Sequence, residues 1–221
     1  MTTTASSKKK KGSVPRWLAI PAPKPQLDEA EVSAKYPRMR LQVFMGIFIG
    51  YATFYLIRNN VPLVTPILTK ELGFSNAAIG ALSTALLLAY GFSKFLTAMI
   101  SDRSNARLFL PIGLVLSGIA NILLAMTGYM GEGAGAAGYG AAIASIMATI
   151  MVFNGVFQGM GWPPSGRVLV NWFSTSERGT KVSWWNTAHN VGGALSGLLV
   201  AWGFSLFGKT WEVAFWFPAV I

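Results

Sequence analysis

Long runs of apolar residues constrain this chain more than any other feature. Charged residues are nearly absent from six stretches, near 41–68, 77–100, 108–127, 141–165, 181–207 and 211–221. A helix of about 20 apolar residues crosses the hydrocarbon core of a bilayer. Only 12% of the 221 residues are charged, against about a quarter in soluble domains. The pattern predicts an all-α membrane protein with a lipid bilayer as its surroundings; a soluble protein with deeply buried helices is the alternative.

Basic residues gather on one side of these predicted spans. Nine of the 18 Lys and Arg residues precede residue 41, and five more lie in the links near 101–107 and 166–181. The opposite links hold only Lys70 and Lys209. By the positive-inside rule, the N-terminus is expected in the cytoplasm. This topology explains the net charge of +10, so we expect no nucleic-acid partner.

Two segments between or before the spans are predicted to be irregular. Residues 1–38, with Lys8–Lys11, are interpreted as a disordered cytoplasmic basic tail, because no apolar core and cleavage site of a signal peptide follows them. The Gly- and Ala-rich link at 128–140 is expected to be a flexible external loop. The chain contains no cysteine, which excludes disulfides and thiol chemistry within it.

The last apolar stretch is short. It begins near Trp211 and reaches Ile221 after 11 residues, and at about 1.5 Å per residue it cannot cross a bilayer. We therefore expect residues 39–221 to be the transmembrane part of a longer chain, with the last helix incomplete.

Arg58 is a charged residue inside the first span. It lies roughly 25 Å along that span, where an arginine costs about 2.5–3.5 kcal/mol. Tyr51, Tyr55 and Pro62 share a helical stripe with it. A guanidinium in a water-accessible cavity suits phosphate or carboxylate through paired hydrogen bonds, and snorkelling toward the outer surface is the alternative.

His189 is the only histidine of the chain and lies inside the fifth span. An ionisable group within a membrane span indicates function by default. Its helical stripe contains Trp185, His189, Gly192 or Gly193, and Ser196. Asn186 and Asn190 lie beside this stripe, and Asn190 could instead bridge two helices. Gly193 and Gly197 are spaced for close helix packing.

Two further spans carry polar residues in their interiors. Tyr90 and Lys94 lie one turn apart in the second span, and snorkelling of Lys94 toward the inner surface is the alternative to a functional role. Gln158 and Trp162 are predicted to share a face of the fourth span, which the Pro pair 163–164 interrupts. No metal-ligand cluster or nucleophile–base pair is visible. We therefore predict an anion site, and neither an enzyme nor a cofactor.

Five stretches carry a family resemblance. "GYATFYLIRNN", "AYGFSKF", "SDRSNARLFLP", "FQGMGWPPSGR" and "ERGTKVSWWNTAHNVGG" resemble, in this order, motifs of the organophosphate:phosphate antiporters of the major facilitator superfamily, and within them those of the bacterial glycerol-3-phosphate transporters. The resemblance runs from about residue 36 to the end. It implies a twelve-helix fold in two halves, of which this chain is the N-terminal six-helix half with its sixth helix truncated and the C-terminal half absent.

The resemblance also implies roles for residues. Arg58 matches the arginine that the first half contributes to the site between the halves, and His189 matches a histidine that faces the substrate phosphate. The other expected substrate-binding residues are Tyr51, Tyr55, Tyr90, Lys94, Gln158, Trp162, Trp185 and Asn186. The loop "SDRSNAR" resembles one that holds the inner gate by charge pairing. The expected gating residues are Asp102, Arg103, Arg167, Glu177 and Arg178.

The implied function is exchange of cytoplasmic inorganic phosphate for an external organic phosphate, glycerol 3-phosphate first, across a bacterial inner membrane by alternating access. The expected partners are these two anions, the bilayer and the other half of the same chain, without which we expect the piece to be inactive. Glycerol-3-phosphate transporters usually have lysine where this chain has Asn59, so one positive charge is missing near the site. A membrane sensor of external sugar phosphate and a facilitator of another small organic anion are the alternatives.

Overall fold

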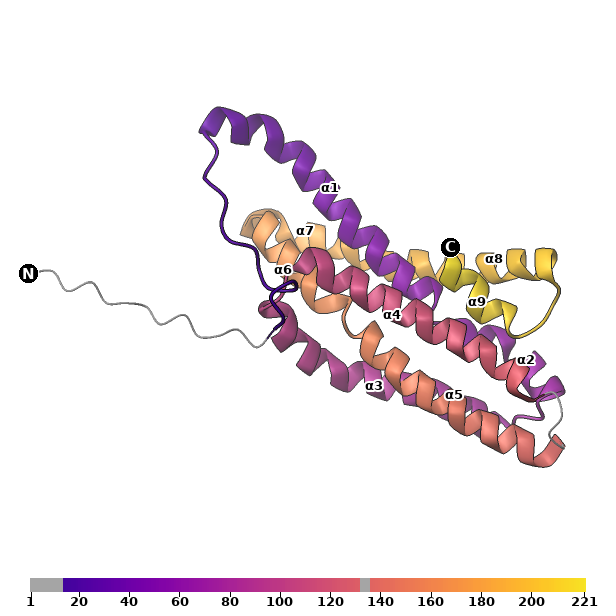
Figure 1. Cartoon of the computed structure of the whole chain (residues 1–221). Coiled ribbons are helices and arrows are strands. Elements are labelled where there is room, and N and C mark those ends of the chain that lie inside the picture. The colour runs from indigo at the N-terminus through magenta and orange to yellow at the C-terminus, as the bar shows by residue number, and fades with distance from the viewer. Residues whose placement is uncertain (1–13, 132–135) are drawn as a thin grey trace, which may run out of the picture.

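The computed structural model describes residues 14–131 and 136–221, and within them the regular structure is helical apart from one isolated bridge between Ala19 and Ser104. The elements are α1 (Glu29–Leu56), α2 (Asn60–Glu71), α3 (Asn76–Asp102), α4 (Ala106–Met126), the 3-10 helix η1 (Thr127–Gly131), α5 (Ala136–Gln158), α6 (Trp162–Trp172), α7 (Thr175–Asn186), α8 (Ala188–Phe207) and α9 (Val213–Val220). Figure 1 shows them as one elongated bundle.

The long helical segments confirm the predicted spans. Five segments of the described chain are long and apolar enough to cross a membrane: Glu29–Glu71, Asn76–Asp102, Ala106–Tyr129, Ala142–Trp172 and Thr175–Phe207. The sixth apolar stretch forms α9, a helix of 8 residues. The all-α membrane architecture follows from this arrangement.

Two of the spans are broken where the sequence places proline. The first span is interrupted at residues 57–59, between α1 and α2, and the fourth at residues 159–161, between α5 and α6. A proline removes the hydrogen bond to the carbonyl four residues earlier and its ring crowds that carbonyl. Pro62 acts in this way on Arg58, and the Pro pair 163–164 acts on the residues of the second break. The predicted continuous stripe from Tyr51 to Pro62 is therefore wrong beyond Leu56.

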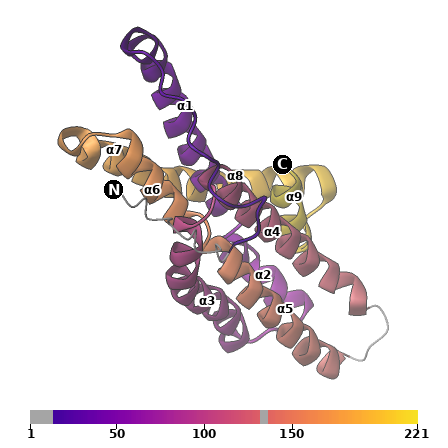
Figure 2. The same cartoon turned by 60° about the vertical axis from the view of Figure 1, so that its left-hand side comes forward.

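Small residues allow two helix pairs to pack closely, α1 with α8 and α3 with α5 (Figures 1 and 2). A methyl group at Gly192 would overlap the carbonyl oxygen of Ala52, and one at Gly155 would overlap that of Leu86. The close contact on α8 is thus made by Gly192. The predicted packing through Gly193 and Gly197 is not formed among the described residues, because a Cβ at Gly197 would meet none of their atoms within 4 Å and one at Gly193 would meet only Asn59 Nδ2, at 3.6 Å.

One end of the bundle, here called the basic end, holds the start of α1 and the links from α3 to α4 and from α6 to α7, which lie together on the left of Figure 1. Helix α1 begins at Glu29, where Asp28 caps it by accepting the Glu31 amide at 2.7 Å. Residues 29–38 are therefore helical, and the predicted tail ends earlier than residue 38. Lys8–Lys11 and residues 132–135 of the Gly-rich link lie outside the described residues. The rest of that link is helical, in η1 and the start of α5, so the predicted flexible loop is wrong for residues 128–131 and 136–140.

The described part of the tail contacts the bundle. Leu18 is buried, and its carbonyl accepts the Asn105 amide at 2.7 Å in the link between α3 and α4. The isolated bridge between Ala19 and Ser104 adjoins this contact. Residues 15–19 thus form a short strap across the α3–α4 link, which sequence patterning did not predict.

Candidate functional site

Arg58 lies in the break between α1 and α2, with only 9% of its surface exposed. Its Nε donates to Gln158 Oε1 at 2.9 Å. Its guanidinium carbon lies 4.2 Å from the ring centre of Tyr55 and 4.1 Å from that of Tyr90. Aromatic faces attract a cation without neutralising it. The side chain is therefore held by an amide and two aromatic rings, none of which is a carboxylate.

One nitrogen of this guanidinium has no partner. Nη2 of Arg58 is buried and makes no hydrogen bond within the described residues. The ion pairs that these residues form join Lys35 to Glu31 and Arg40 to Glu177, so neither involves Arg58. A buried charged donor without an acceptor costs free energy. This nitrogen is thus a buried donor without an acceptor among the described residues.

Gln158 is the protein acceptor of Arg58 and is completely buried. It ends α5, immediately before the second break, and its Nε2 donates to Ser117 Oγ at 2.7 Å and to Phe54 O at 3.4 Å. Trp162 begins α6 on the other side of the break and is 48% exposed. Gln158 and Trp162 thus belong to two different helices, one buried and one exposed, and the prediction that they share one helical face stays a prediction.

Aromatic side chains extend the site along α1 toward α7. The Tyr51 ring lies 4.5 Å from Trp185 and 5.5 Å from Tyr55, and Trp185 in turn lies 6.4 Å from Trp162. Trp185 is buried and its Nε1 donates to Ile47 O at 3.2 Å. These contacts join Tyr51 and Trp185 to Tyr55, whose ring contacts Arg58.

His189 lies beside this aromatic layer. It begins α8 after a turn at Thr187, is partly exposed, and its ring centre lies 5.5 Å from that of Tyr55. Tyr55 therefore contacts Arg58 and adjoins His189, which brings the two cationic candidates to the same aromatic ring. The structure joins α1 and α8 closely at Gly192, one turn further along.

Lys94 and Asn186 complete the predicted set. Lys94 is partly exposed, and its Nζ lies 4.0 Å from the ring centre of Tyr90, on α3. Asn186 is exposed at the end of α7 and contributes no hydrogen bond or ring contact to the cluster within the described residues. The structure thus connects nine of the ten predicted residues through direct contacts and leaves Asn186 at the margin.

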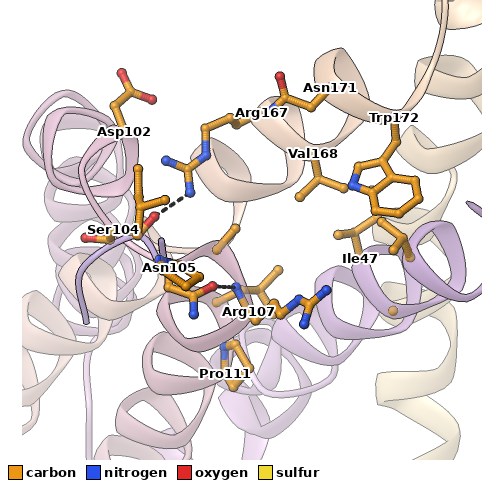
Figure 3. Close-up of a pocket in the computed structure, with 16 residues that line it drawn as sticks. Ile47, Asp102, Ser104, Asn105, Arg107, Pro111, Arg167, Val168, Asn171 and Trp172 are labelled. Atoms are coloured by element: carbon orange, nitrogen blue, oxygen red, sulfur yellow. Dashed lines mark hydrogen bonds between the residues drawn. The ribbon is translucent and has the colours of Figure 1, made fainter. Parts of the chain in front are cut away.

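The predicted gating residues lie at the basic end. A cavity of about 560 Å³ lies there between α1, α4 and α6. Arg167 points from α6 toward the α3–α4 link and donates to the carbonyl oxygens of Ser101 and Ser104 (Figure 3). Asp102 is exposed at the same rim. Arg167 therefore binds backbone carbonyls here and does not pair with a carboxylate.

Glu177 and Arg178 lie at the start of α7. Glu177 pairs with Arg40 of α1 and closes a capping box with Ser174. Arg178 donates to the carbonyls of Val170 and Phe173, at 3.1 Å each, at the end of α6. Arg103 is exposed in the α3–α4 link. Charge pairing is thus present at this end, but through Arg40, which sequence reasoning counted only among the basic residues before residue 41.

Two other residues were missed. Ser117 of α4 and Asn154 of α5 are buried behind Gln158. Only the polar character of Asn154 within an apolar helix could have indicated it, since no sequence spacing relates residues on two different helices.

The sequence profile described as the Major Facilitator Superfamily matches residues 47–221. The glycerol-3-phosphate transporter of Bacillus subtilis is 48% identical over 196 residues, which are 89% of this chain and 41% of that protein. A probable hexose phosphate transport protein of Chlamydia pneumoniae is 37% identical over 88% of this chain and 39% of its own length. The membrane sensor protein UhpC of Escherichia coli is 38% identical over 84% of this chain and 39% of its own length. The chain therefore spans about two fifths of the length of these relatives.

Proposed function

The chain belongs to the major facilitator superfamily, and from this premise we propose that it forms the N-terminal half of a transporter that exchanges inorganic phosphate for an organic phosphate. The five apolar spans make it a multi-pass membrane protein. The protein is proposed to lie in a bacterial inner membrane with its basic end in the cytoplasm, because positively charged links stay on that side.

Arg58 is the observation that carries this proposal. It is buried in a membrane span, it has no carboxylate partner among the described residues, and Nη2 lacks an acceptor. Phosphate offers oxygens whose spacing matches the guanidinium fork and forms charge-assisted hydrogen bonds with it. A phosphate group at Nη2 would satisfy the orphaned donor and the buried charge together.

The neighbouring side chains would supply the rest of the site. His189 would donate a hydrogen bond to the same phosphate from α8, and Lys94 would attract the anion along α3. Tyr51, Tyr55, Tyr90, Trp162, Trp185, Gln158 and Asn186 would shape and line the cavity. None of these roles requires covalent chemistry.

Alternating access would follow from the charge of the site. Substrate sites of such transporters lie near mid-membrane between the two halves of the fold, and the second half is proposed to face Arg58 with an arginine of its own. Two facing guanidinium groups repel each other unless an anion lies between them. The occupied site would therefore favour closure and the empty site would oppose it, which couples movement in one direction to movement in the other.

Glycerol 3-phosphate is the proposed organic substrate. The support is the 48% identity to a relative named for transporting it. Asn59 lies next to Arg58, is exposed, and has its amide nitrogen 3.6 Å from where a Cβ at Gly193 would lie. The lysine usual at this position in glycerol-3-phosphate transporters would add a charge there, so this chain has one positive charge fewer beside Arg58, and the proposal of this substrate rests on the identity alone.

Counterflow in proteoliposomes tests the proposal. Vesicles containing the complete protein are loaded with radiolabelled inorganic phosphate, and unlabelled glycerol 3-phosphate is added outside. We expect rapid release of label that stops when the external anion is omitted. Release at the rate of protein-free vesicles in both conditions would contradict the transport proposal.

A sensor is the second candidate, because a relative named as a membrane sensor is 38% identical. A sensor would bind sugar phosphate without sustained exchange. Saturable binding of labelled glucose 6-phosphate to the purified complete protein, together with absent counterflow, would favour this candidate over the transporter.

A further inference from the structure

A chain of buried polar side chains lies behind Arg58 and joins α4 to α5. Ser117 and Gln158 are 0% exposed and Asn154 is 1% exposed. Gln158 Nε2 donates to Ser117 Oγ at 2.7 Å, and Ser117 Oγ donates to Asn154 Oδ1. Polar groups in an apolar bundle cost free energy unless they are hydrogen-bonded. Hydrogen bonds connect these three side chains in the order Asn154, Ser117 and Gln158, and Gln158 in turn binds Arg58.

The direction of these hydrogen bonds is fixed by the number of protons. A serine hydroxyl has one proton to donate and two lone pairs. Ser117 gives its proton to Asn154, so it can only accept from Gln158. Gln158 must then turn its NH₂ group to Ser117 and its carbonyl oxygen to Arg58. The opposite orientation would place two donors, Nε2 of Gln158 and Nε of Arg58, against each other.

The orientation of the Gln158 amide determines how the Arg58 side chain is held. Nε is occupied by Gln158 Oε1 at 2.9 Å, and the rings of Tyr55 and Tyr90 hold the guanidinium plane. The buried Nη2 remains without an acceptor among the described residues. We propose that Ser117 and Asn154 are positioning residues, which orient the Gln158 amide so that Arg58 presents its terminal nitrogens to the anion. This inference rests on the proposed function for its consequence, although not for its geometry.

Replacing Ser117 or Asn154 should therefore weaken phosphate binding, although neither side chain would contact the anion itself. In Ser117→Ala the Gln158 NH₂ keeps only the Phe54 carbonyl, at 3.4 Å, so the amide is held less firmly and its bond to Arg58 alone resists rotation. In Asn154→Leu the Ser117 proton loses its acceptor and is free to point at Gln158, which favours the wrong amide orientation. Loss of one neutral hydrogen bond of this kind predicts a rise in the KM for phosphate of about three- to tenfold.

The experiment is a double-mutant cycle in the complete protein. Phosphate exchange in proteoliposomes gives KM and kcat for wild type, Ser117→Ala, Asn154→Leu, Gln158→Leu and the double variant Ser117→Ala/Gln158→Leu. Ser165→Ala is the matched control, because Ser165 is also 0% exposed but its hydroxyl donates only to Gly161 O of its own turn, at 2.9 Å. The cycle separates a pairwise effect from general damage.

We expect KM to rise in both single variants with kcat nearly unchanged, and the control to resemble wild type. Ser117→Ala should add nothing in the Gln158→Leu background, because it acts only through Gln158. Additive effects, or a wild-type KM in both Ser117→Ala and Asn154→Leu, would overturn the positioning role.

A second readout needs no transport. Labelling of Arg58 by phenylglyoxal, followed by mass spectrometry without phosphate present, reports how firmly the guanidinium is held. Ser117→Ala should raise the labelling rate of Arg58 but not in the Gln158→Leu background. If wild type fails to exchange phosphate while this pattern appears, the proposed function falls and the positioning role stands. Equal labelling of wild type and Ser117→Ala would overturn the positioning role.

Discussion

Substitution of Arg58 by lysine is the most direct test of how the site would bind an anion. The change keeps one positive charge and removes the planar fork. In the structure Arg58 uses Nε to bind Gln158 and stacks between Tyr55 and Tyr90, while Nη2 lacks a partner. A lysine ammonium has no separate Nε–H to bind Gln158 and cannot make two parallel bonds to a phosphate. It therefore isolates the contribution of geometry from that of charge.

The expected magnitude follows from the bonds lost. A hydrogen bond to a charged group contributes about 1.5–3 kcal/mol, and about 1.4 kcal/mol corresponds to a factor of ten in affinity. Loss of one of two bonds to the phosphate predicts a rise in KM of about 10- to 150-fold for Arg58→Lys. Arg58→Ala removes the charge as well and should abolish measurable exchange.

The assay is exchange of radiolabelled inorganic phosphate in proteoliposomes that contain the complete protein. Lys70→Ala is the control, because it removes an exposed positive charge at the other end of α2 from Arg58 and should leave KM unchanged. A wild-type KM in Arg58→Lys would refute paired hydrogen bonding to the guanidinium. Wild-type exchange in Arg58→Ala would refute the assignment of the site to this residue.

Three further results are expected. His189→Ala should raise the KM for phosphate about tenfold through loss of one hydrogen bond to a charged group, and unchanged exchange would remove His189 from the site while leaving Arg58. Asn59→Lys should lower the KM for a sugar diphosphate relative to glycerol 3-phosphate in competition assays, because it adds a charge beside Arg58; an unaltered ratio would separate Asn59 from specificity. Gly192→Val should destabilise the α1–α8 contact by about 1–3 kcal/mol, seen as a lower melting temperature in detergent, whereas Gly197→Ala, in open space, should melt as wild type does.

The sequence predicted the spans well and identified the ionisable residues inside them, for a physical reason. Apolar runs and intramembrane charges are governed by transfer from water to lipid, which each residue experiences largely by itself. Arg58 and His189 could therefore be identified without knowing their neighbours. The Arg58–Gln158 bond could not, because it joins residues 100 positions apart and depends on how α1 and α5 meet.

The helix breaks were only partly predictable. Proline positions indicated where the backbone would be weakened, but not whether the helix would bend or stop. The strap of residues 15–19 and the pairing of Arg40 with Glu177 were missed, because both depend on contacts between segments that are distant in sequence. Close packing at Gly192 in place of Gly193 depends on which face of α8 meets α1, which residue spacing within α8 does not specify.

The two helix breaks impose one physical requirement on the residues around Arg58. A proline leaves the carbonyl four residues before it without its helical donor, and in a membrane such a group must find another partner. Thr97 Oγ1 donates to Gly159 O at 2.9 Å, four residues before Pro163. Gln158 Nε2 reaches Phe54 O, which no proline frees but which is one of the last carbonyls of α1 and lies at a helix end. Polar side chains therefore have to gather at the breaks whether or not a ligand binds there. Arg58 is the exception in this group, since it brings a charge and an unpaired donor where the backbone needs only neutral partners. The helix breaks do not require this charge or this unpaired donor, and that is the strongest structural reason to propose an anion beside Arg58.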